Sequence, residues 1–256
     1  MKPKIGIYGF SGCWGEQIVI LNCEDQLLDI FGAFDIVDFL GGSSVNDTES
    51  RLLIAFVEGS IANAREEADL RKIRDRSDLL IACGSCACFG GIAAMDAQAP
   101  RSEVIQQVYG KNGPAGSWDI GPHRPLSDFI KVDLAIPGCP IEKTEFLRVV
   151  SSLLNGDTPL MPAYPVCLEC KMLEYECLLM KRGLPCAGPV TVAGCGARCP
   201  GYNIACVGCR GPVDEANMGS IEKIFEKSSI PKEQIKHRLR TFAAPVLDKT
   251  GNRGQE

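Results

Sequence analysis

Several features that would assign this chain of 256 residues to a common class of protein are missing. Basic residues are not in excess, since 27 Lys and Arg face 32 Asp and Glu, so the charge does not indicate a nucleic-acid-binding face. No apolar run reaches the roughly 18 residues of a membrane-spanning helix. The opening residues, MKPKIGIYGF, contain no apolar signal core and no twin arginine, and the chain lacks a glycine-rich dinucleotide fingerprint. We therefore expect a cytoplasmic protein whose partners are other proteins or small molecules.

Cysteine, in contrast, is abundant: the chain has 14, and eight of them lie between Cys167 and Cys209. These eight read C-x2-C-x6-C-x8-C and then C-x3-C-x6-C-x2-C, which divides them into two sets of four. Disulfide scaffolds belong mainly to short secreted chains, so a metal that prefers thiolates is favoured. Two iron–sulfur cubanes would use all eight. Structural zinc shares the paired C-x2-C signature but leaves the other six cysteines unexplained.

The first part of the chain alternates between strand and helix patterns. Short apolar runs bounded by turn residues predict strands over 4–9, 35–40, 52–57, 78–82 and 131–136. Helical spacing of apolar residues, or a charge-rich helical composition, predicts helices over 17–31, 63–76 and 146–154. Residues 96–125 are rich in proline and glycine and are expected to form an insertion loop. This alternation predicts an α/β fold over residues 1–158, with a flavodoxin-like, doubly wound parallel sheet.

The composition changes after the turn-rich joint at residues 155–159. Residues 159–215 contain the eight clustered cysteines with little periodicity, so we expect an iron–sulfur domain with little regular structure that a metal organises. Residues 216–256 are expected to form a helical tail, with apolar residues at helical spacing in two stretches. Both helices are interpreted as packing elements.

Three further cysteines occupy informative places in the strand pattern. Cys13 follows the first predicted strand, Cys86 the fourth and Cys139 the fifth. In an open parallel sheet the loops after the strands converge on one crevice, so these thiols should become neighbours. A cubane needs a fourth ligand, and Glu16 is the nearest candidate in sequence. A solvated carboxylate favoured by the helix N-terminus is an equally good interpretation of Glu16.

The last three cysteines have no clear ligand pattern. Cys23 lies among apolar residues of the first predicted helix, so we interpret it as a small buried side chain. Cys83 and Cys88 flank the cysteine that follows the fourth strand, and Cys88 is the reserve ligand for the crevice.

Seven segments carry a resemblance to a known family. They are GFSGCWGEQ, VEGSIA, ACGSCACFGGI, KVDLAIPGCP, PVCLECK, PCAGPVTVAGCGARCP and CVGCRGPV, in this order. Together they resemble the small, electron-transferring subunit of cytoplasmic [NiFe] hydrogenases, of the sulfhydrogenase delta or NAD(P)-linked type. The resemblance covers roughly residues 3–213 and is specific in both order and spacing.

This resemblance implies three [4Fe–4S] clusters with defined ligands. The proximal ligands would be Cys13, Cys86 and Cys139, with Glu16 at the position where the family usually has a second cysteine. The distal set would be Cys167, Cys170, Cys177 and Cys186. The medial set would be Cys195, Cys199, Cys206 and Cys209.

The resemblance also implies partners. The chain lacks the nickel-binding C-x2-C pairs that a hydrogenase large subunit has near its ends, so a [NiFe] large subunit would carry out the hydrogen chemistry. A flavin or iron–sulfur subunit of diaphorase or ferredoxin type would exchange electrons at the distal end, and the final acceptor stays open among NAD(P), F420, ferredoxin and a heterodisulfide. Glu58 and Arg124 would order the interface or the cluster loops, or else be a helix-end charge and a surface salt bridge. An electron-relay subunit of a complex I-like module without hydrogenase activity and a structural zinc protein remain as alternatives.

Overall fold

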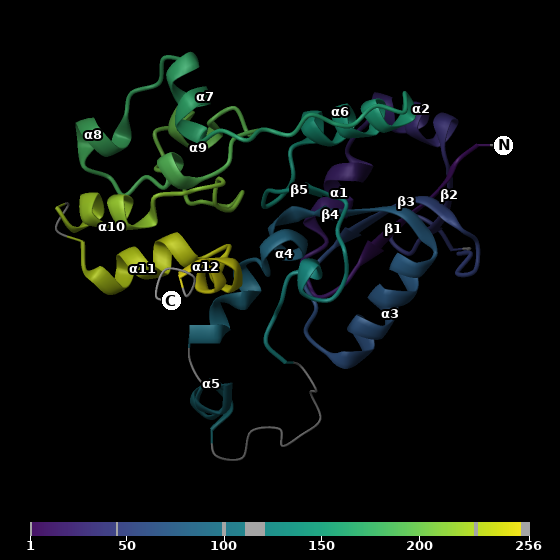
Figure 1. The fold of residues 1–256 in the computed structure, drawn as a ribbon, viewed down its shortest axis with the longest axis horizontal. Coiled ribbons are helices and arrows are strands. Elements are labelled where there is room, and N and C mark those ends of the chain that lie inside the picture. Colours follow the sequence, from purple (N-terminus) through teal and green to yellow (C-terminus); the bar gives the residue numbers. More distant parts are fainter. Residues whose placement is uncertain (1, 45, 99–100, 111–120, 228–229, 252–256) are drawn as a thin grey trace.

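The computed structural model describes residues 2–44, 46–98, 101–110, 121–227 and 230–251. Its centre is a five-stranded parallel sheet with the strand order β2-β1-β3-β4-β5 (Figure 1). The strands are β1 (Lys4–Gly9), β2 (Asp35–Phe39), β3 (Leu52–Glu58), β4 (Ser77–Cys83) and β5 (Leu134–Ile136). This is the strand order of flavodoxin, so the predicted fold class is confirmed.

Four of the strands end at the same level of the sheet. Gly9 at the end of β1 pairs with Glu58 of β3, which in turn pairs with Cys83 of β4. Cys83 pairs with Ile136, the last residue of β5. The loops that follow these strands therefore leave the sheet side by side, at the edge where α/β proteins bind their ligands.

Helices cover both faces of the sheet. The helices α1 (Gly15–Leu21), α2 (Asp25–Ala33) and α6 (Lys143–Leu154) lie on one face, and α3 (Ala64–Asp75) and α4 (Gly84–Phe89) on the other (Figure 1). A cluster of buried apolar side chains lies in each interface, and on the α6 side Phe146 packs edge-on against Phe56 with 5.4 Å between ring centroids. The chain thus has the three-layer arrangement that the alternating pattern predicts.

Two predictions about helices were wrong. The single helix expected over 17–31 is interrupted between α1 and α2, because Glu24 has a left-handed φ of 48° that no helix continues through. The expected insertion loop contains the helix α5 (Arg101–Tyr109), whose sequence RSEVIQQVY has no glycine or proline. Residues 99–100 and 111–120 of that loop lie outside the described residues. Strand β5 is also shorter than the predicted 131–136.

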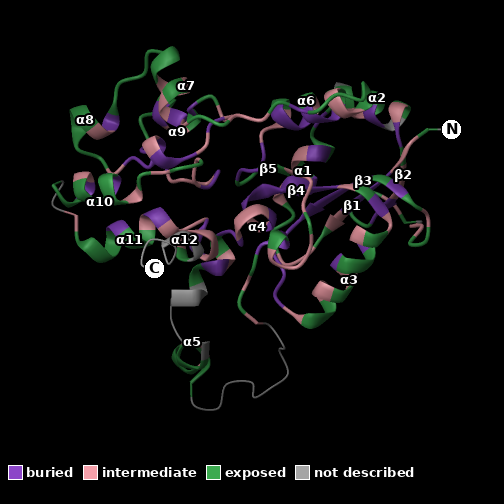
Figure 2. Cartoon of the chain, in the orientation of Figure 1, coloured by how far each residue is buried: buried purple, intermediate pink, exposed green. Residues whose placement is uncertain are grey.

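The cysteine-rich region has short helices joined by irregular segments. They are α7 (Val166–Met172), α8 (Leu178–Arg182) and α9 (Arg198–Gly201), together with the 3-10 turn η3 (Gly188–Val190). The 3-10 turns η1 (Ile92–Gln98) and η2 (Leu126–Asp128) lie in the sheet domain. In Figure 2 the strands of the sheet are largely buried, whereas α7 and α8 carry mainly exposed and intermediate residues. The expected lack of extended regular structure in this region is confirmed.

In the described part of the tail there are three helices rather than the two expected. Helices α10 (Met218–Glu226) and α11 (Lys232–Arg240) pack together, and their buried residues Ile221, Phe225 and Ile235 join Val190 of the cysteine-rich region in one apolar cluster. The unexpected third helix, α12 (Ala244–Gly251), returns toward α4. Among the described residues, no helix has the length and apolar character that crossing a membrane requires.

Candidate metal centres

The crevice at the ends of the strands holds three thiols. Cys13 lies in the loop after β1, Cys86 on α4 directly after β4, and Cys139 in the loop after β5. A Cβ added to Gly15 would lie 3.3 Å from Sγ of Cys13 and 3.7 Å from Cβ of Pro140, so Cys13 faces the turn that contains Cys139. The structure therefore brings together the three cysteines that the sequence places on separate loops.

Glu16 belongs to the same crevice and is buried there. Its side chain is 5% exposed and lies against Gly84, where an added Cβ would be 2.1 Å from Glu16 Oε1. Glu58, at the end of β3, is 2% exposed and accepts a hydrogen bond of 2.8 Å from Nε2 of Gln17. Burial raises the pKa of Glu16 to about 8, and the hydrogen bond and negative charge of Glu58 add to the rise. The interpretation of Glu16 as a solvated carboxylate is therefore wrong.

Two of the crevice thiols, Cys86 and Cys139, are also held in their neutral form. Burial raises the pKa of Cys86 to about 12, and the charges of Glu16, Cys139 and Cys13 raise it further. Burial raises the pKa of Cys139 to about 11, with Glu16 as the next cause. Cys86, Cys139 and Glu16 are therefore difficult to ionise in the crevice, and a bound cationic metal centre would deprotonate such ligands.

Of the three unassigned cysteines, Cys83 and Cys88 also lie near the crevice, because burial raises the pKa of each and the charge of Glu16 adds to the rise. The thiol of Cys88 lies 3.6 Å from the carbonyl oxygen of Ala82 and packs into the apolar cluster on the α3 face. Cys83 is buried in the opposite cluster, with its sulfur 3.8 Å from the carbonyl oxygen of Ile81. Cys23 is 0% exposed in that same cluster, in agreement with its interpretation as a small buried side chain.

The first four cysteines of the cysteine-rich region form one group. Cys167 and Cys170 lie on α7, Cys177 precedes α8, and Cys186 follows it. A Cβ on Gly188 would lie 3.4 Å from Sγ of Cys167 and 3.5 Å from Sγ of Cys186, so glycine leaves the space between the two sulfurs open. Burial raises the pKa of Cys167 to about 11, and the charges of Cys186, Cys170 and Cys177 add to the rise.

The last four cysteines form a second group around the start of α9. Burial raises the pKa of Cys209, and the charges of Cys195 and Cys199 raise it further. Burial also raises the pKa of Cys206 to about 12, and Cys209 is among the charges that add to this rise. Cys195 and Cys199 act on Cys209, and Cys186 and Cys209 act on Cys206, so these thiols lie near one another, and their division into ligand sets stays a prediction.

Direct contacts connect the three groups in a fixed order. The backbone N–H of Cys206 donates to Sγ of Cys186 at 3.3 Å, which joins the last group to the first four cysteines of the region. The backbone of Cys139 hydrogen-bonds to the Cys209 thiol, which joins the last group to the crevice. Ser85, next to the crevice thiol of α4, also donates its hydroxyl to the carbonyl oxygen of Cys209. The group at residues 195–209 thus lies between the other two.

A buried ion pair that the sequence analysis missed spans the same junction. Arg210 is 1% exposed and Glu145 2%, and Nη2 of Arg210 donates to Oε1 of Glu145 at 2.9 Å. The other guanidinium nitrogens donate to the carbonyl oxygens of Ala193 at 2.7 Å and Pro137 at 2.6 Å. The only sequence signal was an arginine directly after the last clustered cysteine, since its partner is 65 residues away on α6.

The structure also decides between the interpretations of Glu58 and Arg124. Glu58 ends a strand inside the crevice and is not a helix-end charge. Arg124 forms an ion pair with Asp128 at 2.8 Å and lies over the ring of Phe129, 4.7 Å from its centroid. The salt-bridge interpretation of Arg124 is therefore confirmed.

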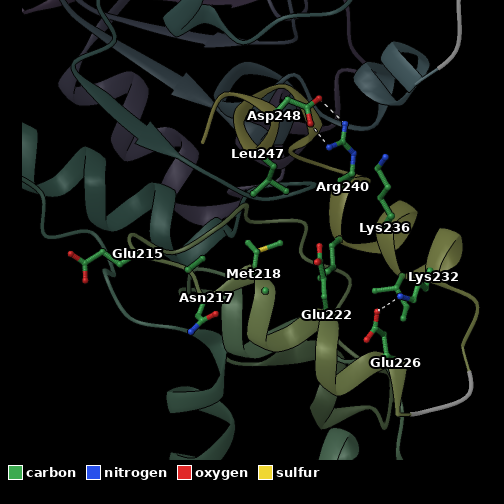
Figure 3. Close-up of a pocket in the computed structure, with 14 residues that line it drawn as sticks. Glu215, Asn217, Met218, Glu222, Glu226, Lys232, Lys236, Arg240, Leu247 and Asp248 are labelled. Atoms are coloured by element: carbon green, nitrogen blue, oxygen red, sulfur yellow. Dashed lines mark hydrogen bonds and ion pairs between the residues drawn. The ribbon is translucent and has the colours of Figure 1, made fainter. Parts of the chain in front are cut away.

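A cavity of about 910 Å³ lies away from the cysteines, between α10, α11 and α12. Figure 3 shows its mixed charges, with Lys232 paired to Glu226 at 3.0 Å and Arg240 paired to Asp248 at 2.6 Å. No cysteine lines it.

Among the described residues, no three His, Cys, Asp or Glu side chains are arranged around one point as a single metal ion requires.

Comparison with known proteins assigns these features to a family of redox subunits. Residues 13–153 match the family described as the 20 Kd subunit of NADH ubiquinone oxidoreductase. The sulfhydrogenase 2 subunit delta of Pyrococcus furiosus is 38% identical, and the similarity covers 94% of this chain and 99% of that protein. A vhu-type subunit of the F420-non-reducing hydrogenase of Methanocaldococcus jannaschii is 32% identical, with 84% of each chain covered.

A solved structure agrees with the fold. A chain of an NAD+-reducing [NiFe]-hydrogenase in the H2-reduced state superposes with a TM-score of 0.56 and 25% sequence identity. The superposition covers 63% of this chain and 96% of the other. The similarity to the P. furiosus protein covers nearly the whole chain, so it includes the cysteine-rich region beyond residue 153.

Proposed function

Since this chain belongs to the NADH ubiquinone oxidoreductase 20 Kd subunit family and is a relative of sulfhydrogenase subunit delta, we propose that it is the electron-relaying small subunit of a soluble [NiFe] hydrogenase complex. The complex would be cytoplasmic, where thiols stay reduced. The chain would hold three [4Fe–4S] clusters, which accept and release electrons when bound.

The proposed ligand sets follow the three groups of thiols. Cys13, Cys86, Cys139 and Glu16 would hold the proximal cluster. The medial ligands would be Cys195, Cys199, Cys206 and Cys209. The distal ligands would be Cys167, Cys170, Cys177 and Cys186. All three sets consist of soft thiolates, apart from one carboxylate, and glycines leave space beside sulfur atoms of the proximal and distal sets.

Glu16 is the proposed fourth proximal ligand, and Cys88 the less favoured candidate. After burial, the charge of Glu16 is the next cause of the raised pKa of Cys86, Cys139 and Cys88, so Glu16 lies close to all three thiols. The thiol of Cys88 instead faces the carbonyl oxygen of Ala82 within an apolar cluster. We expect Glu16→Gln to lose the proximal cluster, and Glu16→Cys to retain it with the four-thiolate coordination that is usual in the family.

The chain of contacts between the three groups supports the proposal most directly. Cys139 of the crevice contacts Cys209, and Cys206 contacts Cys186, so the groups follow one another through the molecule. A relay needs such an order, because each site exchanges electrons only with its neighbours. A structural zinc protein gives no reason for three thiol groups in sequence.

The exposed crevice supports a large subunit as the first partner. Cys13 and Cys139 are exposed, and beside them Trp14 and Ile18 of the α1 region are 44% and 53% exposed. Exposed apolar side chains around reactive groups are typical of an interaction surface. An obligate interface there would bury about 2,000 Å² or more.

The other end of the relay supports an electron-exchanging second partner. Cys177 is exposed, and the nearby Met172 and Met180 are 74% and 75% exposed. A flavin or iron–sulfur subunit of diaphorase or ferredoxin type would exchange electrons at this surface. The final acceptor would be NAD(P), F420 or a ferredoxin-type carrier.

Anaerobic purification of the native complex tests the proposal. Nickel analysis would find the metal on the partner subunit, and H2 would bleach the visible iron–sulfur absorbance of this chain only when that partner is present. Full iron with no nickel and no bleaching by H2 would instead indicate a relay subunit of a complex without hydrogenase activity. A chain that contains zinc and no iron would contradict the proposal.

A further inference from the structure

The buried pair of Arg210 and Glu145 lies at the junction between the sheet domain and the cysteine-rich region. Glu145 is on α6, which lies beside the connection to that region in Figure 1. Arg210 directly follows Cys209, the thiol that contacts the crevice loop. The pair thus stands where the proposed proximal and medial sites meet.

The guanidinium of Arg210 holds both metal-binding loops. Through Nη1 it binds the carbonyl oxygen of Pro137, two residues before Cys139 of the crevice. Through Nε it binds the carbonyl oxygen of Ala193, two residues before Cys195 of the medial set. One planar group with fixed N–H directions therefore sets the distance between the two loops.

The surrounding backbone is built to accommodate this pair. Gly194 has a φ of 115°, and an added Cβ would lie 2.3 Å from Nη2 of Arg210 and 2.6 Å from Oε1 of Glu145. Any larger residue at this position would displace the ion pair. Burial raises the pKa of Glu145, and the positive charge of Arg210 opposes that rise.

We propose that Arg210 is a positioning residue that fixes the spacing of the proximal and medial sites and biases the medial site toward reduction, with Glu145 as its counter-charge. The inference rests on the proposed function, because it requires clusters in both sites. A lysine cannot bind both carbonyl groups as the guanidinium does, although it preserves the charge. Spacing and charge can therefore be separated by substitution.

The charge of Arg210 should shift the midpoint potential of the medial site in a definite direction, which a purely structural role would not predict. A positive group beside an iron–sulfur site favours the added electron, and a negative group opposes it. Arg210→Gln should therefore lower the midpoint potential of the medial site, whereas Glu145→Gln should raise it. We expect about a tenfold change in the ratio of reduced to oxidised sites at fixed potential, or about 59 mV for one electron.

The test is a redox titration of the anaerobically purified complex, followed by electron paramagnetic resonance. The midpoint potential of the medial signal reports the charge, and the magnetic splitting between the reduced proximal and medial signals reports their spacing. Arg210→Lys should keep the potential and change the splitting, while Glu145→Gln should shift the potential and keep the splitting. Arg182→Gln, a control in the same region whose arginine pairs on the surface with Glu176, should change neither.

Iron content distinguishes a failure of the proposed function from a failure of the proposed role of Arg210. A wild-type complex without reducible iron would overturn the proposed function and, with it, the role of Arg210. Iron-loaded variants whose potentials do not move in opposite directions, or an Arg210→Lys splitting equal to that of the wild type, would overturn the role of Arg210 alone. If Arg210→Gln does not load iron, the splitting in Arg210→Lys and the potential in Glu145→Gln still test the role of Arg210. Each of these variants retains a group that binds in the same place.

Discussion

Raising the pH should destabilise the iron-free protein through Glu16. Its pKa is raised from 4.5 to about 8, first by burial and then by Glu58. A carboxyl group with a raised pKa contributes stability that is complete below its unfolded pKa, near pH 4.5, and lost as the pH rises through its folded pKa, near 8. At about 1.4 kcal/mol per pKa unit, this loss amounts to about 4–5 kcal/mol.

Glutamine at this position removes the titrating group and retains its shape. In the iron-free state, Glu16→Gln should match the wild type near pH 4.5 and exceed its free energy of unfolding by up to about 4–5 kcal/mol above pH 8. Urea denaturation followed by circular dichroism of the sheet, after removal of iron by a chelator, measures the difference. Glu67→Gln, at a half-buried position of α3 where the carboxylate pairs with Arg71, is the matched control and should follow the wild-type profile.

Iron should reverse this dependence, because a carboxylate ligand binds in its ionised form. At about pH 7, a pKa of about 8 leaves roughly one tenth of Glu16 ionised, so ligation there costs about tenfold in affinity. If the wild type and Glu16→Gln give parallel profiles of stability against pH without iron, the argument for a buried, protonated Glu16 is wrong.

Three other outcomes follow from the packing and grouping of side chains. Cys206→Ser should remove about 4 of 12 iron atoms, whereas Cys23→Ser, at a fully buried position of the sheet domain, should remove none, as iron analysis will report. Phe146→Ala should lower the free energy of unfolding by about 3–5 kcal/mol in urea titrations, because it leaves a cavity beside the sheet. Ile18→Glu should weaken co-purification with the large subunit, whereas Met180→Glu, also exposed but at the distal end, should leave it unchanged.

Local sequence patterns were sufficient to predict the sheet and the crevice. The apolar runs of β1, β3 and β4 are buried on both sides of a parallel sheet, which makes them recognisable without knowledge of their neighbours. Because parallel strands end at one edge, the positions of Cys13, Cys86 and Cys139 after strands predicted their proximity. The division of the eight clustered cysteines into two sets rests on their spacing and stays a prediction.

One feature that the sequence did not predict is a local backbone conformation, and two others depend on residues that are distant in the chain. The interruption between α1 and α2 depends on the left-handed backbone of Glu24, a residue that is common inside helices. The pairing of Arg210 with Glu145 joins residues 65 apart. The raised pKa of Glu16 requires Glu58 from another strand. Such contacts follow from tertiary packing, which no periodicity of the sequence encodes.

Metal analysis of this chain in the anaerobically isolated native complex tests the central claim most directly. Three [4Fe–4S] clusters predict about 12 iron atoms per chain, with three distinct paramagnetic signals on reduction. A count of about 8 without a proximal signal would remove the proximal cluster and the ligand role of Glu16. Zinc in place of iron, with no signal on reduction, would contradict the account as a whole.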